Sequence, residues 1–181
     1  GFGALFDLSG RYREPVLGPK TLAIVVTQSG ETADTKAAME YCKAKGVMTA
    51  AVVNVPTSSI ARECDAILPT LAGVEIGVAS TKAFTAQLCA LLATAIAAGR
   101  ARGFLSREVE KEHVAAMLEL PRLISEALKT EPQVQKLAIE IAKARDVLYL
   151  GRGPHYPIAL EGALKLKEIS YIHAEGYAAG E

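Results

Sequence analysis

Three charged residues near the end of the chain have a spacing that suits proton transfer. Glu161, Lys165 and Glu168 are four and then three positions apart, so a helix places them on one face. A carboxylate beside an ammonium can move a proton between adjacent carbons of a sugar, the carboxylate acting as base while the ammonium steadies charge on oxygen. The same spacing also fits an ordinary solvated face with a Glu–Lys pair worth about 0.2 to 0.5 kcal/mol. Spacing alone leaves both interpretations open.

A polar segment earlier in the chain has the composition of an anion site. Residues 27–32, Thr-Gln-Ser-Gly-Glu-Thr, offer hydroxyl and amide groups between an apolar run and a predicted helix. The first N–H groups of a helix lack partners and favour a phosphate, and open α/β sheets bind ligands at the carboxyl ends of their strands. The segment has no phosphate-loop lysine, which favours a sugar phosphate over a nucleoside triphosphate. The alternative is that Ser29 or Thr32 simply caps the helix.

The elements that must position this segment alternate between strand and helix. We expect strands over 21–26, 48–53 and 66–68, and helices over 33–45 and 56–62. The first strand is β-branched without alternation, which is typical of a parallel strand buried on both faces. Alternating strands and helices predict an α/β fold with a parallel sheet and right-handed crossovers.

The second half of the chain is mostly helical and then repeats the strand–loop–helix pattern. Helices are expected over 80–100, 107–129 and 131–144. A strand over 147–150 is followed by the turn Gly151-Arg152-Gly153 and a helix that Pro157 opens at its first position. The pattern predicts no partner for this last strand within the chain.

Composition narrows the functional class. The chain has 181 residues, of which 50% are hydrophobic, and its 20 basic residues balance its 20 acidic ones. This composition is typical of a core-forming globular protein and favours neither nucleic acid nor membrane as a partner. The apolar run 83–98 is mostly alanine and contains polar residues, so we expect a soluble helix there.

Cysteine and histidine usage favours a cytoplasmic protein without a metal centre. Cys42, Cys64 and Cys89 are odd in number and far apart, which fits a reduced compartment. Residues 1–8 lack the basic start of a signal peptide, so the cytoplasm is the expected location. The histidines share no ligand spacing, and we expect no metal and no cofactor; they are His113, His155 and His173.

Three long motifs carry a resemblance to a known family. The motifs are 29–35 (SGETADT), 75–85 (EIGVASTKAFT) and 150–175, which contains Tyr156-Pro157-Ile158-Ala159-Leu160-Glu161-Gly162-Ala163-Leu164-Lys165-Leu166-Lys167-Glu168. From about Arg11 to Glu181 the chain resembles the isomerase part of the glutamine:fructose-6-phosphate aminotransferases, also called glucosamine-6-phosphate synthases. That part of the family has two sugar isomerase (SIS) subdomains, each a doubly wound parallel sheet. It makes glucosamine 6-phosphate from fructose 6-phosphate and glutamine-derived ammonia.

The resemblance implies roles for residues at both candidate sites. Glu168 matches the base that shuttles a proton between C1 and C2, Lys165 assists it, and Glu161 is close by. The residues that match substrate-binding positions are Thr27, where the family commonly has serine, Gln28, Ser29, Thr32, Val78 through its backbone, and Ser80. A non-catalytic SIS module that senses an amino-sugar phosphate is the alternative, and it would not need Lys165 and Glu168.

The resemblance also implies an incomplete fold. We expect an α/β, SIS-type doubly wound parallel sheet flanked by helices, incomplete, with the start of a second SIS unit. The expected divisions are an unmatched segment 1–10, a first subdomain 11–103 lacking its first strand, a helical connection 104–145, and the second subdomain from 146 to 181. Residues 4–8 are one candidate for a substitute strand; the other solution is a homodimer, formed by domain swapping. Such a piece is expected to bind fructose 6-phosphate or glucosamine 6-phosphate with little or no turnover.

Overall fold

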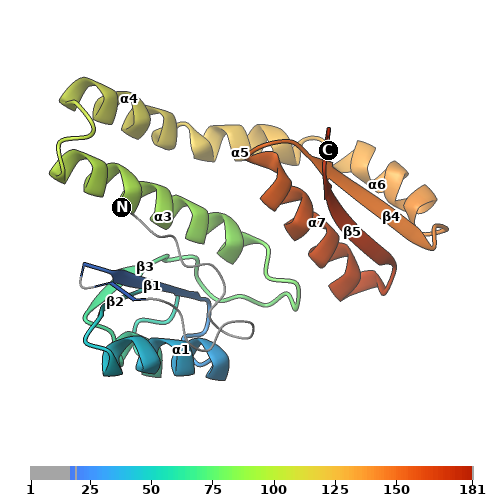
Figure 1. Ribbon diagram of the computed structural model, residues 1–181. Helices are drawn as coiled ribbons and strands as arrows, with labels where there is room; N and C mark the ends of the chain where they lie inside the picture. The colour runs from blue at the N-terminus through green and yellow to red at the C-terminus, as the bar shows by residue number, and fades with distance from the viewer. Residues whose placement is uncertain (1–16, 19, 181) are drawn as a thin grey trace. The chain divides into compact units, whose positions relative to one another are not determined.

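The computed structural model describes residues 17–18 and 20–180 (Figure 1). These residues form two compact units, each of which is described by itself. The first contains the described residues up to Glu75 together with Ser80–Val114, and the second contains Ile76–Ala79 and the described residues from Ala115 onward. The substitute strand predicted for residues 4–8 lies outside the described residues.

The first unit is a parallel sheet covered by helices. Strands β1 (Leu22–Thr27), β2 (Met48–Val53) and β3 (Ala66–Pro69) pair in the order β1-β2-β3, all parallel. Helix α1 packs against β1 and β2, and α3 packs against β2 on the opposite face of the sheet (Figure 1). The bounds of the helices are α1 Ala33–Ala44, α2 Ser59–Glu63 and α3 Lys82–Ala101, and α4 (Arg107–Leu118) begins in this unit and ends in the second. The predicted parallel α/β sheet is confirmed.

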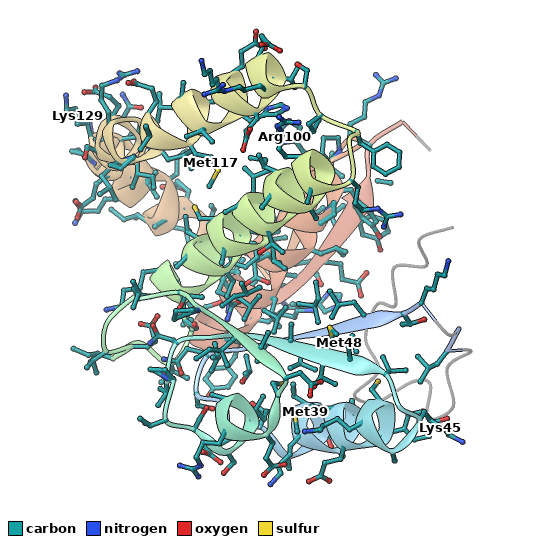
Figure 2. All side chains as sticks on the ribbon, turned by 90° about the vertical axis from the view of Figure 1, so that its left-hand side faces the viewer. Met39, Lys45, Met48, Arg100, Met117 and Lys129 are labelled. Atoms are coloured by element: carbon teal, nitrogen blue, oxygen red, sulfur yellow. The ribbon has the colours of Figure 1, made fainter. Side chains whose placement is uncertain are left out.

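The core of this unit lies between α1, α2 and the sheet. Met39 of α1 is fully buried there against Val53 of β2 and Ile60 of α2, and Figure 2 shows Met39 between the helix and the strands. The prediction that β1 is buried on both faces is wrong. Its side chains alternate, with Ile24 and Val26 38% and 40% exposed, because β1 is the edge strand of the described sheet and α3 covers β2 instead.

The second unit contains a parallel pair of strands that sequence analysis did not anticipate. Strand β4 (Asp146–Gly151) pairs in parallel with β5 (His173–Ala178), and α7 (His155–Ser170) packs against both. The prediction that the last strand has no partner is therefore wrong. Gly176 permits the close approach of helix and strand, because a Cβ there would lie 3.0 Å from the backbone nitrogen of Leu160.

Two helix boundaries also differ from the predictions. The expected helix 107–129 is two helices, α4 and α5 (Leu120–Leu128), followed by α6 (Glu131–Ile141). Pro121 lies in the first turn of α5, where its missing N–H breaks no helical hydrogen bond, and this explains the division. Pro157 is the third residue of α7 rather than the first.

Helix α3 has the length and apolar composition of a membrane span, with a mean hydropathy of 1.4. Within the described part of the chain it is the one helix with these properties. Its position in the unit gives a second reason for that composition. Ala83 and Ile96 are buried, and the helix packs against β2 as a covering helix of a sheet does. Length and composition alone do not distinguish these two roles.

Candidate functional site

The polar segment 27–32 forms the turn from β1 into α1. The Gly30 N–H donates to Thr27 Oγ1 over 3.1 Å, and the Glu31 N–H donates to Ser29 Oγ over 3.2 Å. Thr32 is the N-cap residue of α1, yet its side chain makes no capping hydrogen bond. The simple capping role considered for Thr32 is therefore wrong. Its exposed hydroxyl lies 3.5 Å from Thr27 Oγ1 and beside the first, unpaired N–H groups of α1.

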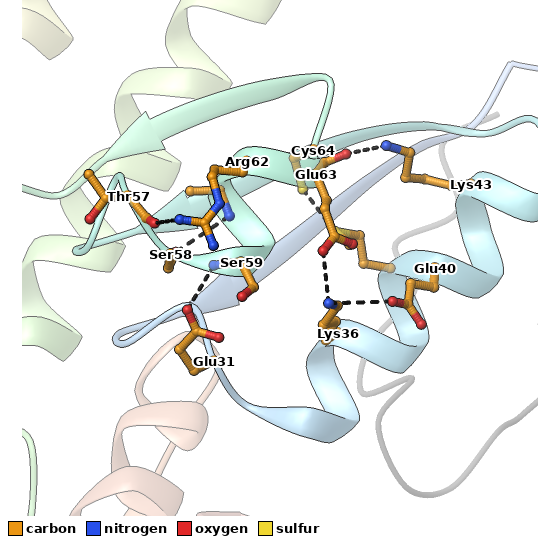
Figure 3. Close-up of polar contacts among 12 residues, drawn as sticks. Glu31, Lys36, Glu40, Lys43, Thr57, Ser58, Ser59, Arg62, Glu63 and Cys64 are labelled. Carbon is orange, nitrogen blue, oxygen red and sulfur yellow. Dashed lines mark hydrogen bonds and ion pairs between the residues drawn. The ribbon is translucent and has the colours of Figure 1, made fainter.

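Helix α2 braces this turn from the side (Figure 3). The Gly30 carbonyl accepts a hydrogen bond from the Ile60 N–H over 3.1 Å, and the Glu31 carboxylate accepts one from the Ser59 N–H over 2.7 Å. Gly30 has a φ of +70°, and a Cβ at this position would lie 1.9 Å from Ser58 Oγ. Glycine is therefore required both by the left-handed backbone and by the close approach of α2. The sequence marks Ser58 and Ser59 only as the start of a helix, and no local pattern indicates this role.

The Glu31 carboxylate of the turn does not face the start of α1, where an anion would bind. The hydrogen bond from the Ser59 backbone holds the pKa of Glu31 below its usual value, so this side chain is ionised at neutral pH. Its charge is directed at the first residue of α2 rather than at the start of α1 (Figure 3). The hydroxyl and amide groups of the turn therefore remain as neutral donors.

We expect Glu31→Gln to destabilise the chain more at neutral pH than in acid. Because the pKa of Glu31 is lowered by folding, its carboxylate stabilises the folded state above the unfolded-state value of 4.5. That contribution is lost as the pH falls through the lower, folded-state value. The deficit of the variant in thermal midpoint should be full at pH 7 and smaller at pH 3.5, since the unfolded-state carboxyl is then mostly protonated. Glu112→Gln, at an exposed position of α4, is the matched control, and an equal deficit of Glu31→Gln at both pH values would contradict this expectation.

One ion pair and one hydrogen bond join α1 to α2 and fix the helix that follows the turn. Lys36 Nζ lies 2.8 Å from Glu63 Oε1 and 3.7 Å from Glu40 Oε1, and Lys43 donates to the Glu63 carbonyl (Figure 3). The hydrogen bond to Glu63 raises the pKa of Lys36. These contacts hold both ends of α1 against α2, Lys36 from its first turn and Lys43 from its last.

The predicted sugar-side residues lie in the segment between β3 and α3. Val78 is 92% exposed, and Ser80 is partly buried with a φ of +30°. The boundary between the two compact units falls between these residues, with Val78 in the second unit and Ser80 in the first. Thr81 is the N-cap residue of α3, and its side chain makes no capping hydrogen bond.

The predicted cluster of charges on α7 is present. Lys165 Nζ lies 2.8 Å from Glu168 Oε2 and 3.3 Å from Glu161 Oε1, so the expected shared face is confirmed. The side chains of Lys165 and Glu161 are only 23% and 24% exposed, whereas an ordinary surface pair, Glu140 of α6 and Lys143 just beyond its end, is 72% and 67% exposed. The hydrogen bond to Glu168 raises the pKa of Lys165, which keeps it an ammonium. The arrangement can hold charge on an oxygen atom and offer a neighbouring carboxylate as base.

The remaining titratable residues form no further centre in the described part of the chain. His173 Nδ1 lies 2.9 Å from Asp146 Oδ1, and its Nε2 lies 3.3 Å from Glu175 Oε1, on an exposed face of β4 and β5. No group of three histidine, cysteine, aspartate or glutamate side chains suited to a metal ion occurs among residues 17–18 and 20–180. The three cysteines are free thiols.

Known proteins resemble the chain over almost its whole length. Glutamine–fructose-6-phosphate aminotransferases (isomerizing) from Bradyrhizobium diazoefficiens and Caulobacter vibrioides are 70% and 60% identical over 171 residues, 94% of this chain. The solved C-terminal domain of glucosamine-fructose-6-phosphate aminotransferase from Francisella tularensis is 42% identical. It superposes with a TM-score of 0.90 and covers 94% of this chain and 48% of that domain.

The length of these matches shows which part of the relatives the chain corresponds to and which domain family it belongs to. It spans 28% of the length of the curated relatives, so it corresponds to a part of their isomerase region. The SIS domain family matches residues 8–97 and 140–181, which include the 27–32 turn, Val78, Ser80 and the charged face of α7. A sheet of parallel strands with covering helices, matched over these two ranges, shows that the chain belongs to the SIS domain family.

Proposed function

We propose that the chain is the portion of an isomerizing aminotransferase that binds a sugar phosphate and isomerises it. The substrate class is fructose 6-phosphate, and the product is glucosamine 6-phosphate, with ammonia supplied from glutamine. The observation that carries the proposal is the partly enclosed ammonium of Lys165 held between two carboxylates. Relatives that are 70% and 60% identical carry the name of this enzyme.

The phosphate is assigned to the turn between β1 and α1. Ser29 and Thr32 present exposed hydroxyls beside the unpaired N–H groups of α1, and Gln28 adds an amide. Thr27 is assigned to the same ligand, and because it is buried and accepts from the Gly30 N–H, it also shapes the turn. Neutral donors and a helix N-terminus together hold a phosphate dianion without a lysine.

The proton transfer is assigned to α7. Glu168 takes the proton from one carbon of the open-chain sugar and returns it to the next, while the Lys165 ammonium stabilises charge on the oxygen. Glu161 keeps Lys165 in place through the second ion pair. Val78, through its backbone, and Ser80 are assigned to the sugar. The chain covers 28% of its relatives, and we propose that it binds the sugar phosphate with little or no turnover by itself.

A sensor of amino-sugar phosphates is the competing function, and no observation favours it. A module that only binds needs the anion-binding turn but has no use for a lysine enclosed by two carboxylates. The curated relatives are named as enzymes.

Calorimetric titration of the 181-residue chain tests this proposal. Fructose 6-phosphate and glucosamine 6-phosphate should each give saturable heat, inorganic phosphate should bind more weakly, and fructose without phosphate should not bind measurably. Binding of phosphorylated and unphosphorylated fructose with equal affinity would contradict the assignment of the turn to phosphate.

We also propose that the chain acts in the cytoplasm as a homodimer, formed by exchange of elements between two copies. The support is the apolar surface that each unit leaves uncovered, with Leu22 50% exposed on β1, and Leu148 and Leu150 63% and 68% exposed on β4. Such surface is a usual reason for association. Sedimentation equilibrium tests the proposal, and a monomer at high micromolar concentration would refute it.

A further inference from the structure

A single asparagine at the carboxyl end of β2 organises the segment that follows β3. Thr70 Oγ1 donates to Asn54 Oδ1 over 3.1 Å, and the Ala72 N–H donates to the same oxygen over 2.8 Å. Asn54 Nδ2 donates in turn to the Gly73 carbonyl over 2.7 Å. One side chain therefore fixes three groups within four consecutive residues, which we call the 70–73 turn.

This clamp holds a backbone that is unfavourable by itself. Leu71, between the two groups that donate to Asn54 Oδ1, has a φ of +53°. The left-handed conformation is unfavourable for a residue that carries a Cβ. Leu71 is 82% exposed, so packing of its side chain does not offset that cost. The hydrogen bonds of Asn54 are what hold the turn in this form, and strain of this kind is typical of functional segments.

The backbone of Asn54 also connects the end of β2 to the turn at residues 27–32, which we call the phosphate turn. Its N–H donates to the Gln28 carbonyl over 3.2 Å, and the Thr70 N–H donates to the Val53 carbonyl over 3.0 Å. On the other side of the 70–73 turn, the Lys82 ammonium donates to the Val74 carbonyl, so the segment leading to Ser80 is held at both ends. Asn54 thus links the backbone of the phosphate turn to the start of the segment that carries Val78 and Ser80.

We propose that Asn54 is a positioning residue that sets the sugar-side segment relative to the phosphate turn. This inference rests on the proposed function. It extends that function by naming the residue that positions the sugar-binding segment and the phosphate turn correctly for one substrate. The phosphate turn is joined to Asn54 through the backbone alone, whereas the 70–73 turn depends on its side chain. Removing the side chain should therefore weaken contacts with the sugar and leave the phosphate contacts in place.

The test compares two ligands across a small set of variants. Asn54→Leu removes all three side-chain bonds at similar size, Asn54→Asp keeps the acceptor for Thr70 and Ala72, and Gln135→Leu on the exposed surface of α6 is the control. We expect Asn54→Leu to bind fructose 6-phosphate about tenfold more weakly, a change of about 1.4 kcal/mol. Its affinity for inorganic phosphate should stay within about threefold of the unaltered chain. Asn54→Asp should lose less than Asn54→Leu, and Gln135→Leu should change neither affinity.

Each other outcome is decisive. Equal loss of both ligands in Asn54→Leu, or a loss in Asn54→Asp as large as in Asn54→Leu, would assign Asn54 a structural role only and overturn the inference. Unchanged affinity for fructose 6-phosphate would overturn it while leaving the proposed function intact. Absence of saturable binding by the unaltered chain would instead refute the proposed function, and this inference with it. Faster hydrogen exchange of the amides at 70–73 in Asn54→Leu would show that the clamp had been released.

Discussion

Replacing Ser29 and Thr32 together by alanine is expected to abolish measurable binding of fructose 6-phosphate. Each hydroxyl lies at the turn between β1 and α1, and a hydrogen bond to a charged group contributes about 1.5 to 3 kcal/mol. Losing two of them amounts to at least about 3 kcal/mol, which weakens binding by a hundredfold or more. The measurement is calorimetric titration with fructose 6-phosphate up to millimolar concentration, and the same loss should occur with inorganic phosphate.

A matched double variant controls for the loss of two hydroxyl groups. Ser125 and Thr130 are also exposed and lie far from the turn in the sequence. Their hydroxyls donate to backbone carbonyls within or next to their own helix. Ser125→Ala with Thr130→Ala should leave the affinity unchanged. The hydroxyls lost in the test variant do not cap α1, and the bond from the Glu31 N–H to Ser29 is exposed, so the thermal midpoint should fall only slightly. Retained affinity within threefold in the Ser29 and Thr32 variant would remove the turn from the phosphate site.

Glu168→Gln is expected to stop proton transfer while leaving substrate binding almost unchanged. A positioned general base contributes about a hundredfold to ten-thousandfold to the rate, and an amide cannot accept the proton. The amide oxygen can still accept the hydrogen bond from Lys165, so the geometry of the face is kept. The chain should be placed within the Bradyrhizobium diazoefficiens relative, which is 70% identical over 171 residues. Exchange of the sugar protons at C1 and C2 with deuterated solvent, followed by NMR, gives the rate.

The surface pair of Glu140 and Lys143 supplies the control for this experiment. Like Glu168 and Lys165, these residues are three positions apart and form an ion pair, but both are largely exposed, and Lys143 lies just beyond the end of α6. Glu140→Gln should leave the exchange rate and the affinity unchanged. If Glu168→Gln reduces the rate by less than about threefold, the face of α7 is an ordinary ion-pair cluster, and the competing function as a sensor becomes the better account.

The sequence predicts elements well where a local pattern is sufficient. Strand β2 has the predicted bounds, and α1 starts at Ala33 as predicted, because apolar runs and helical spacing are properties of short segments. The shared face of Glu161, Lys165 and Glu168 follows from helical periodicity alone. Strand β5 was missed because His173–Ala178 mixes charged residues with glycine, and its pairing with β4 is what makes it a strand.

At the two candidate sites as well, local sequence predicts some features and long-range contacts decide the others. Local sequence is sufficient to place hydroxyl groups before a helix at 27–32 and a lysine between two glutamates on α7. How these residues are held depends on contacts between distant segments. The brace from Ser59 to Glu31 and the clamp from Asn54 to the 70–73 turn join residues 28 and 16 to 19 positions apart. Such contacts depend on the pairing of β2 with its neighbours and on the docking of α2, which no local pattern of residues encodes.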